Sequence, residues 1–174
     1  DSGKIGEVAA SIQRGKVLFS NKARCNSCHV GDNYSDSQFH NLGIGAKDGA
    51  WPEGADLGRF GAQETGHKDA SLIGAYKTPG LRQLLSTAPY MHDGSLQTMD
   101  AVLAHYQKGG AKHPLQNKEI TAFELSPKEK EQLLSFLMRW SILLTSAETA
   151  FNRDCLPLLL QNQRLCIAHT LAEN

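Results

Sequence analysis

The sequence predicts an all-α fold with long loops. Three segments, 4–21, 96–107 and one starting at Ser126, place apolar residues at the spacing of an amphipathic helix. Residues 30–75 are rich in Gly, Asp, Asn and Ser with little periodicity, so we expect loops and short helices there. No segment sustains the alternation typical of a half-buried strand. The chain has 174 residues, which is enough for one domain with a sizeable core.

The first expected helix, 4–21, carries one apolar face that includes Val8, Ile12 and Phe19. Gly15 lowers the intrinsic stability of this helix, but it also allows another element to approach closely. We therefore expect the helix to pack closely at this glycine.

Two further helices are expected in the middle of the chain. One begins at Pro79 and runs through Leu85, and a turn-like segment at 87–94 follows it. The other spans 96–107 and ends at a glycine pair, a common helix stop. Its apolar stripe consists of Leu96, Met99, Leu103 and Tyr106.

The clearest helix start lies at Ser126. This serine is a helix N-cap, Pro127 occupies the first helical position, and Glu129 completes a capping box. The apolar face that follows consists of Leu133, Phe136, Leu137, Trp140 and Leu144. We expect the remaining tail, 146–174, to be helical as well, with a break or a start near Pro157.

The charge balance excludes several classes of partner. Lys plus Arg and Asp plus Glu are both 18, and no block of like charge stands out. We therefore expect no nucleic-acid partner and no binding to an anionic membrane surface. No apolar run approaches the ~20 residues needed to span a bilayer. The polar first residues lack the apolar region of a signal peptide, so an exported protein would be present here in its mature form.

The pattern Cys25-Asn26-Ser27-Cys28-His29 is the attachment motif of a c-type haem. Two thiols at this spacing add to the two vinyl groups of the porphyrin, and the next residue presents an imidazole to the iron. The sequence therefore predicts one covalent haem, held by Cys25 and Cys28, with His29 as the proximal iron ligand. The first part of the chain, 1–145, would be a cytochrome c-like haem domain.

Two other uses of paired cysteines stay open. A zinc site would need a second ligand pair at short spacing, whereas Cys155 and Cys166 lie far away. A thioredoxin-like redox pair would need a βαβ context, but the motif follows a helical pattern. Haem c is attached outside the cytoplasm in bacteria, so we expect a periplasmic protein. That compartment permits a disulfide between Cys155 and Cys166, with two buried free thiols as the alternative.

Several motifs appear in an order that resembles a known family. They are the segments 15–19, 25–29, 56–59, 76–82, 87–95, 105–110 and 125–126. Over roughly residues 10–142 the chain resembles the C-terminal haem domain of the bacterial dihaem cytochrome c peroxidases and MauG-type enzymes. Members of that family carry two haems in two domains, whereas this chain has one attachment motif. The resemblance therefore implies a second haem-bearing subunit or domain as the redox partner.

The resemblance and the spacing offer different sixth ligands for the iron. Tyr106 lies where the family has its distal ligand, a methionine in the peroxidases and a tyrosine in MauG. Met91 lies at a distance from His29 reminiscent of small cytochromes c, and Met99 is a third candidate. Each also has a structural interpretation, because Tyr106 lies on an apolar stripe and methionine fills irregular gaps.

The resemblance assigns roles to a few other residues. Arg82 would contact a haem propionate, with a surface arginine that has no such role as the alternative. The carbonyl groups of Thr87 and Pro89 would bind Ca²⁺, with a further ligand from the missing domain. His92 would lie near the second haem and assist proton movement, although a structural or surface histidine is an equal alternative.

Three functions follow as hypotheses. The first is the electron-relay or oxidising-equivalent haem of a peroxidase or MauG-like oxidase, working with a second haem subunit. The second is a periplasmic monohaem electron-transfer protein without catalysis of its own. The third is a structural haem subunit of a larger complex, with the tail 146–174 as a docking arm.

Overall fold

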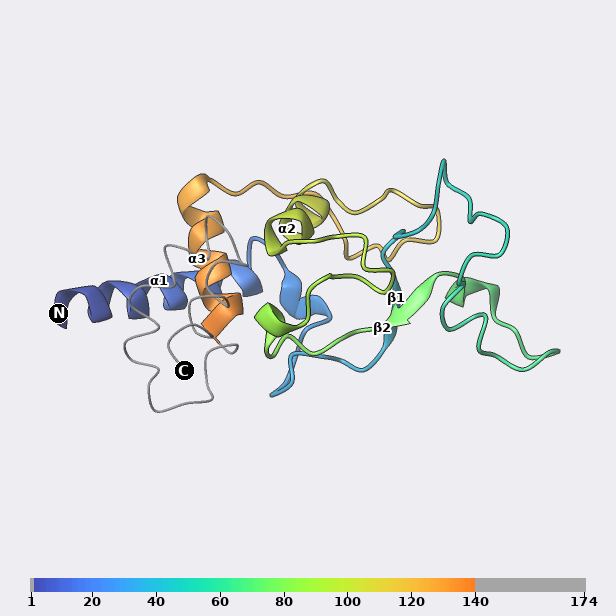
Figure 1. Cartoon of the computed structure of the whole chain (residues 1–174), viewed down its shortest axis with the longest axis horizontal. Helices are drawn as coiled ribbons and strands as arrows, with labels where there is room; N and C mark the ends of the chain where they lie inside the picture. The colour runs from blue at the N-terminus through green and yellow to red at the C-terminus, as the bar shows by residue number, and fades with distance from the viewer. Residues whose placement is uncertain (1, 140–174) are drawn as a thin grey trace, which may run out of the picture.

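The computed structural model describes residues 2–139. Its helices are α1 (Ser2–Ser20), α2 (Met99–Gln107) and α3 (Pro127–Met138). Short 3₁₀ turns lie at η1 (Cys25–Ser27), η2 (Ala70–Leu72) and η3 (Leu84–Ser86). Two strands complete the list, β1 (Phe39–Asn41) and β2 (Ala75–Lys77). Figure 1 shows α1 and α3 crossing at one end of the molecule and long loops filling the other.

Helices α1 and α3 pack against each other at Gly15. A Cβ atom at this position would overlap the carbonyl oxygen of Gln132 on α3, so only glycine allows the helices to come this close. The expected close approach at Gly15 is therefore confirmed. Phe19 on α1 packs against Phe136 on α3, with ring centroids 5.2 Å apart.

The start of α3 has the capping box that the sequence predicts. The Ser126 hydroxyl accepts a hydrogen bond from the Glu129 amide at 3.3 Å, and the Ser126 amide donates to the Glu129 carboxylate at 2.8 Å. The same carboxylate forms an ion pair with Lys22 at 2.7 Å. The cap of α3 is thus tied to the segment that links α1 to η1.

The hydrophobic core collects side chains from α1, η3, α2 and α3, and Tyr90 from the loop between η3 and α2. Its buried members are Phe19, Leu84, Tyr90, Met99, Leu103, Leu133, Leu134, Phe136, Leu137 and Met138. Helix α2 starts at Met99 rather than at residue 96, because Thr98 caps it by accepting a hydrogen bond from the Ala101 amide. Leu96 instead forms an isolated bridge with Tyr90.

The prediction of an all-α fold is not confirmed, because the structure contains a small antiparallel sheet. Strand β1 pairs with β2, and the register places Phe39 opposite Lys77 and Asn41 opposite Ala75. Each strand has three residues, which is too short to produce a recognisable alternation in the sequence.

The prediction of a helix that starts at Pro79 is wrong. Backbone groups of this segment form hydrogen bonds with a distant loop instead of with each other. The Thr78 amide donates to the Gln38 carbonyl at 2.9 Å, and the Leu81 amide donates to the Asn33 carbonyl at 3.3 Å. Gln83 then has a positive φ of 57°, which ends any helical course before the short turn η3.

The loop-rich prediction for residues 30–75 holds apart from η2 and the two short strands. Residues 42–74 form the extended lobe on the right of Figure 1. The expected features at 140–174, including Trp140, Leu144, Cys155, Cys166 and the boundary at 145, lie outside the described residues. None of the helices within residues 2–139 is long and apolar enough to cross a membrane.

Candidate haem attachment site

The attachment motif forms one tight turn directly after α1. Arg24 adopts a left-handed conformation with φ of 52° and starts the 3₁₀ turn η1. The Cys25 carbonyl then accepts hydrogen bonds from the amides of Cys28, at 3.3 Å, and His29, at 2.9 Å. Both cysteines are partly buried and neither is in a disulfide. The turn therefore holds two available thiols and the imidazole within one short segment.

The imidazole of His29 is oriented by the backbone. Its Nδ1 lies 2.8 Å from the carbonyl oxygen of Tyr34, so Nδ1 carries the proton. Burial lowers the pKa of His29, against weaker opposing effects of the Tyr34 and Pro79 carbonyls. The hydrogen bond to Tyr34 uses Nδ1, so it leaves Nε2 as the ring nitrogen that could bind a metal. A neutral ring with one nitrogen donating to a carbonyl is the usual state of a histidine that binds metal through the other nitrogen.

The two thiols do not have the character of a reactive redox pair. Burial raises the pKa of Cys25 to about 12 and also raises the pKa of Cys28. Thioredoxin-like cysteines have lowered pKa values, because the thiolate is the reactive species. The environment of this pair thus disfavours the thioredoxin-like alternative.

Tyr106 faces the attachment site from α2. Burial raises the pKa of its phenol well above the ordinary value, and the nearby Cys25 and Cys28 sulfur atoms add to the increase. His105 packs edge-on against the Tyr106 ring, with centroids 5.4 Å apart. The His105 Nε2 atom is buried and has no hydrogen-bond partner among residues 2–139. Of these two neighbouring side chains, Tyr106 is the one whose surroundings include the two thiols.

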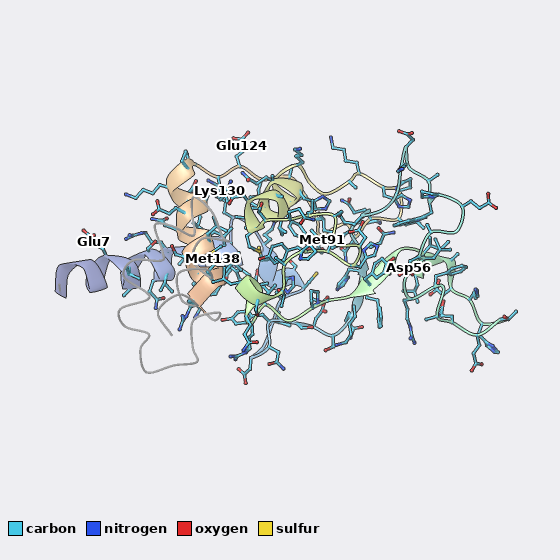
Figure 2. All side chains as sticks on the ribbon, viewed as in Figure 1. Glu7, Asp56, Met91, Glu124, Lys130 and Met138 are labelled. Atoms are coloured by element: carbon cyan, nitrogen blue, oxygen red, sulfur yellow. The ribbon has the colours of Figure 1, made fainter. Side chains whose placement is uncertain are left out.

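The other candidate ligands have different surroundings. Met91 is partly buried, has a positive φ of 71°, and lies between α2 and the sheet in Figure 2. Met99 is 4% exposed and belongs to the hydrophobic core of α2. The structure therefore gives Met99 a packing role and leaves Met91 on a strained loop near the middle of the molecule.

His92 is exposed and stacks on Tyr76. Their ring centroids are 3.6 Å apart with an interplanar angle of 12°. Partial burial lowers the pKa of His92, while the charges of Asp93 and Asp56 oppose this change. The Tyr76 hydroxyl donates to the Asp56 carbonyl at 2.8 Å. The structure thus brings His92 to a tyrosine and two carboxylates.

Arg82 and the expected calcium ligands lie on exposed loops. Arg82 donates two hydrogen bonds to the Asp32 carbonyl, at 3.0 and 2.7 Å, and so ties its segment to the loop after the haem motif. The Thr87 hydroxyl donates to the Leu84 carbonyl at 3.1 Å. Within the described part of the chain, the backbone hydrogen bonds outside helices and strands leave the Thr87 and Pro89 carbonyls unused.

Sequence reasoning missed a polar chain beside the attachment turn. The His40 Nε2 atom lies 2.7 Å from an Asp36 carboxylate oxygen, and its Nδ1 lies 2.6 Å from the Asn117 amide nitrogen. The Asp36 amide donates to the Cys28 carbonyl at 2.8 Å. Ligand atoms of Cys28, Asp36 and His40 lie within 4.8 Å of one another, but haem attachment would consume this thiol. The only sequence signal is the four-residue spacing between Asp36 and His40, which is not part of a helix.

The residues present fit a covalent haem. They supply two free thiols, an imidazole with its tautomer fixed by Tyr34, and a tyrosine that faces both sulfur atoms. A Cys-x-x-Cys-His turn with these surroundings defines the class of c-type haem-binding domains.

Comparison with known proteins identifies the relatives of this domain. The chain is 39% identical over 135 residues to the methylamine utilization protein MauG of Methylorubrum extorquens, covering 78% of this chain and 36% of that protein. It is 32% identical over 163 residues to the cytochrome-c peroxidase IdrP1 of Denitromonas iodatirespirans, covering 78% of this chain and 42% of the relative. The chain belongs with the MauG and cytochrome c peroxidase proteins, as its motif order predicts. No family model matches it.

A solved structure supports the same relationship. The fold resembles the crystal structure of a MauG-like protein associated with microbial copper homeostasis, with a TM-score of 0.66 and 32% identity. The match covers 75% of this chain and 46% of that protein. The chain spans less than half the length of the relatives it matches here.

Proposed function

We propose that the chain is a c-type haem redox domain of a MauG- or peroxidase-like oxidoreductase. The observation that carries this proposal is the His29 imidazole, whose Nδ1 bonds the Tyr34 carbonyl next to two free thiols. Bound haem would supply one-electron redox chemistry. Cys25 and Cys28 would tether the porphyrin, and His29 would bind the iron through Nε2. The relatives support a haem-based redox role for this domain.

Tyr106 would be the second protein ligand of the haem iron in this proposal. Its phenol lies close enough to both cysteines for their charges to act on it, and burial keeps it protonated. A buried phenol gives up its proton only when a cation lies beside it, because desolvation penalises the anion. A phenolate on iron favours the ferric state, whereas a thioether favours the ferrous state and raises the potential. Tyr106 therefore suits a domain that stores oxidising equivalents.

The absorption spectrum of the haem-loaded protein tests the ligand. We expect the oxidised protein to lack the weak far-red sulfur-to-iron band of methionine ligation. We expect Tyr106→Phe to change the ferric spectrum and Met91→Leu to leave it unchanged.

The opposite pattern would select the alternative function. A sulfur-to-iron band that disappears in Met91→Leu and persists in Tyr106→Phe would indicate a monohaem electron-transfer protein. Met91 has the required side chain in a partly buried loop, so this variant is a direct control. A protein that attaches no haem, with Cys25, Cys28 and His29 intact, would contradict both functions.

The same proposal covers the cellular compartment and the redox partner of the domain. We place the protein in the periplasm, where haem c is attached, and assign it a second haem-bearing subunit or domain as its redox partner. The length of the relatives supports this assignment, since this chain spans 36% and 42% of the two curated proteins. The carbonyls of Thr87 and Pro89, which accept no backbone hydrogen bond within residues 2–139, would bind Ca²⁺ at the contact with that partner. Arg82 would contact a haem propionate, and His92 would assist proton movement near the partner haem.

A further inference from the structure

A polar cavity of about 420 Å³ opens beside the segments that flank the proximal histidine. Its lining residues are Asn33, Ser35, Ser37, Lys77, Thr78, Pro79, Gly80 and Arg82. One wall comes from the loop after the attachment motif, and the other from the end of β2 and the residues that follow it. The carbonyl groups of Tyr34 and Pro79, which act on the His29 ring, belong to these same two walls.

Several hydrogen bonds fix the walls relative to each other. The Ser35 hydroxyl donates to the Thr78 carbonyl at 2.7 Å, and the Leu81 amide donates to the Asn33 carbonyl at 3.3 Å. A Cβ atom on Gly80 would lie 3.0 Å from the Asn33 carbonyl oxygen, so the walls also approach closely at their base. The cavity is thus a built feature of the fold, held by contacts that are distant in the sequence.

The charged side chains described in the cavity lining are all positive. Among residues 2–139, two cationic side chains, Lys77 and Arg82, line the cavity, and no carboxylate does. The nearest acidic side chain in sequence on the loop wall, Asp36, is already paired with His40 at 2.7 Å. Across the sheet from Lys77, the exposed Phe39 ring carries the guanidinium of Arg59 at 5.1 Å from its centroid, which adds a third cation on this side.

Hydrogen-bond donors in the cavity are left unused. Among residues 2–139, the Lys77 ammonium group forms no ion pair, and the side chains of Asn33 and Ser37 make no hydrogen bond. An oxoanion satisfies such a set, because each charge-assisted hydrogen bond to an anionic oxygen is stronger than a neutral one. The volume also exceeds what a single-atom anion would fill.

We propose that this cavity binds an oxoanion, a phosphate or a carboxylate, through Lys77, Asn33 and Ser37. Two sources offer this chemistry, a free phosphate ion or a carboxylate side chain of an acidic protein segment. The site goes beyond the haem function, since binding itself requires no redox step. An anion held here adds negative charge behind the proximal ligand, which stabilises the ferric state and lowers the midpoint potential.

Isothermal titration calorimetry of the haem-loaded protein at constant ionic strength tests the site. Inorganic phosphate represents the free ion and a tetraglutamate peptide the protein carboxylates. We expect one of them to bind, and Lys77→Gln to weaken that binding at least about fivefold, the loss of one charge-assisted contact. Asn33→Ala, which leaves the charge unchanged, should weaken it as well. Lys47→Gln removes the same charge from an exposed loop outside the cavity and should bind like wild type.

A second readout is the midpoint potential of the haem. Whichever probe binds should lower the midpoint potential in wild type and in Lys47→Gln. The same probe should lower the midpoint potential less in Lys77→Gln. Equal weakening by both lysine variants would show general charge attraction and would overturn the proposal. Absence of binding by either probe would overturn it too, and is the result expected if a haem propionate fills the cavity. Circular dichroism of each variant confirms that the fold is retained.

Discussion

At the scale of single residues, the surroundings of the attachment turn are set by backbone carbonyls and one acidic side chain. The Tyr34 carbonyl fixes the tautomer of His29, so no substitution of a side chain alone would remove this contact. Asp36 is different, because its carboxylate holds His40 while its amide holds the Cys28 carbonyl. A substitution of Asp36 can therefore remove the carboxylate contact with His40, while the backbone bond to Cys28 can remain.

The pH dependence of stability should report on Asp36. Burial acts to raise its pKa, but hydrogen bonds from the His40 and Thr78 side chains and the Gln38 amide outweigh it and lower the pKa to about 2. The folded pKa lies below the unfolded value, so this contribution is present above about pH 4 and is lost as the pH falls toward 2. Urea unfolding of the haem-loaded protein between pH 6 and pH 2.5 should show a steeper loss for wild type than for Asp36→Asn.

A matched control exists for this measurement. Asp48→Asn removes the same charge from an exposed loop position, where asparagine also tolerates the positive φ of 49°. It should retain the wild-type pH dependence. Parallel curves for wild type and Asp36→Asn would rule out the proposed contribution.

At the scale of secondary-structure elements, the contact between α1 and α3 depends on one glycine. Gly15→Ala should destabilise the protein, because the methyl group would overlap the Gln132 carbonyl and push the helices apart. Overpacking of this kind costs about 1–3 kcal/mol, and the better helix propensity of alanine offsets up to about 1 kcal/mol. Thermal unfolding should therefore show a lower midpoint for this variant.

Gly6 provides the comparison on the same helix. A Cβ atom there has no heavy atom within 4 Å, so Gly6→Ala changes only the helix propensity. Its unfolding midpoint should be equal to or higher than that of wild type. If both alanine variants behave alike, the crossing at Gly15 is not tight in solution.

The elements also show what could be predicted from the sequence. The helices α1, α2 and α3 follow from local patterns, and the capping box at Ser126 is confirmed because both partners lie within four residues. The prediction of a helix from Pro79 is wrong, and the sequence did not predict the sheet, for the same reason. In both cases the backbone bonds to distant segments, such as Thr78 to Gln38, and no local pattern records such bonds.

The residues of the candidate site also fall into those that the sequence predicts and those that only the fold reveals. Cys25, Cys28 and His29 are visible in the sequence because the chemistry of haem attachment fixes their spacing. The roles of Tyr34, His40 and Asn117 depend on contacts between segments up to 77 residues apart, so only the fold reveals them. Tyr106 was suggested by resemblance, and the structure adds that it faces both cysteines.

At the scale of the whole molecule, the buried apolar side chains are distributed unevenly. The hydrophobic core draws on α1, η3, α2 and α3, whereas residues 42–74 bury only Gly43 and Gly74. The lobe formed by residues 42–74 is held mainly by backbone hydrogen bonds, such as that from the Gly74 amide to the Leu57 carbonyl at 2.9 Å. Few buried apolar contacts mean a low free energy of local opening.

Hydrogen exchange of the haem-loaded protein, followed by mass spectrometry, should therefore resolve two regions. Peptides from 42–74 should exchange first, and peptides from α3 and the second half of α1 should exchange last, at rates that approach global unfolding. Gly15→Ala weakens the contact between α1 and α3, so it should accelerate exchange in both helices while leaving the already fast lobe unchanged. Equal protection of residues 42–74 and α3 in wild type would mean that backbone hydrogen bonds and the attached haem, rather than buried apolar side chains, dominate the stability of the lobe.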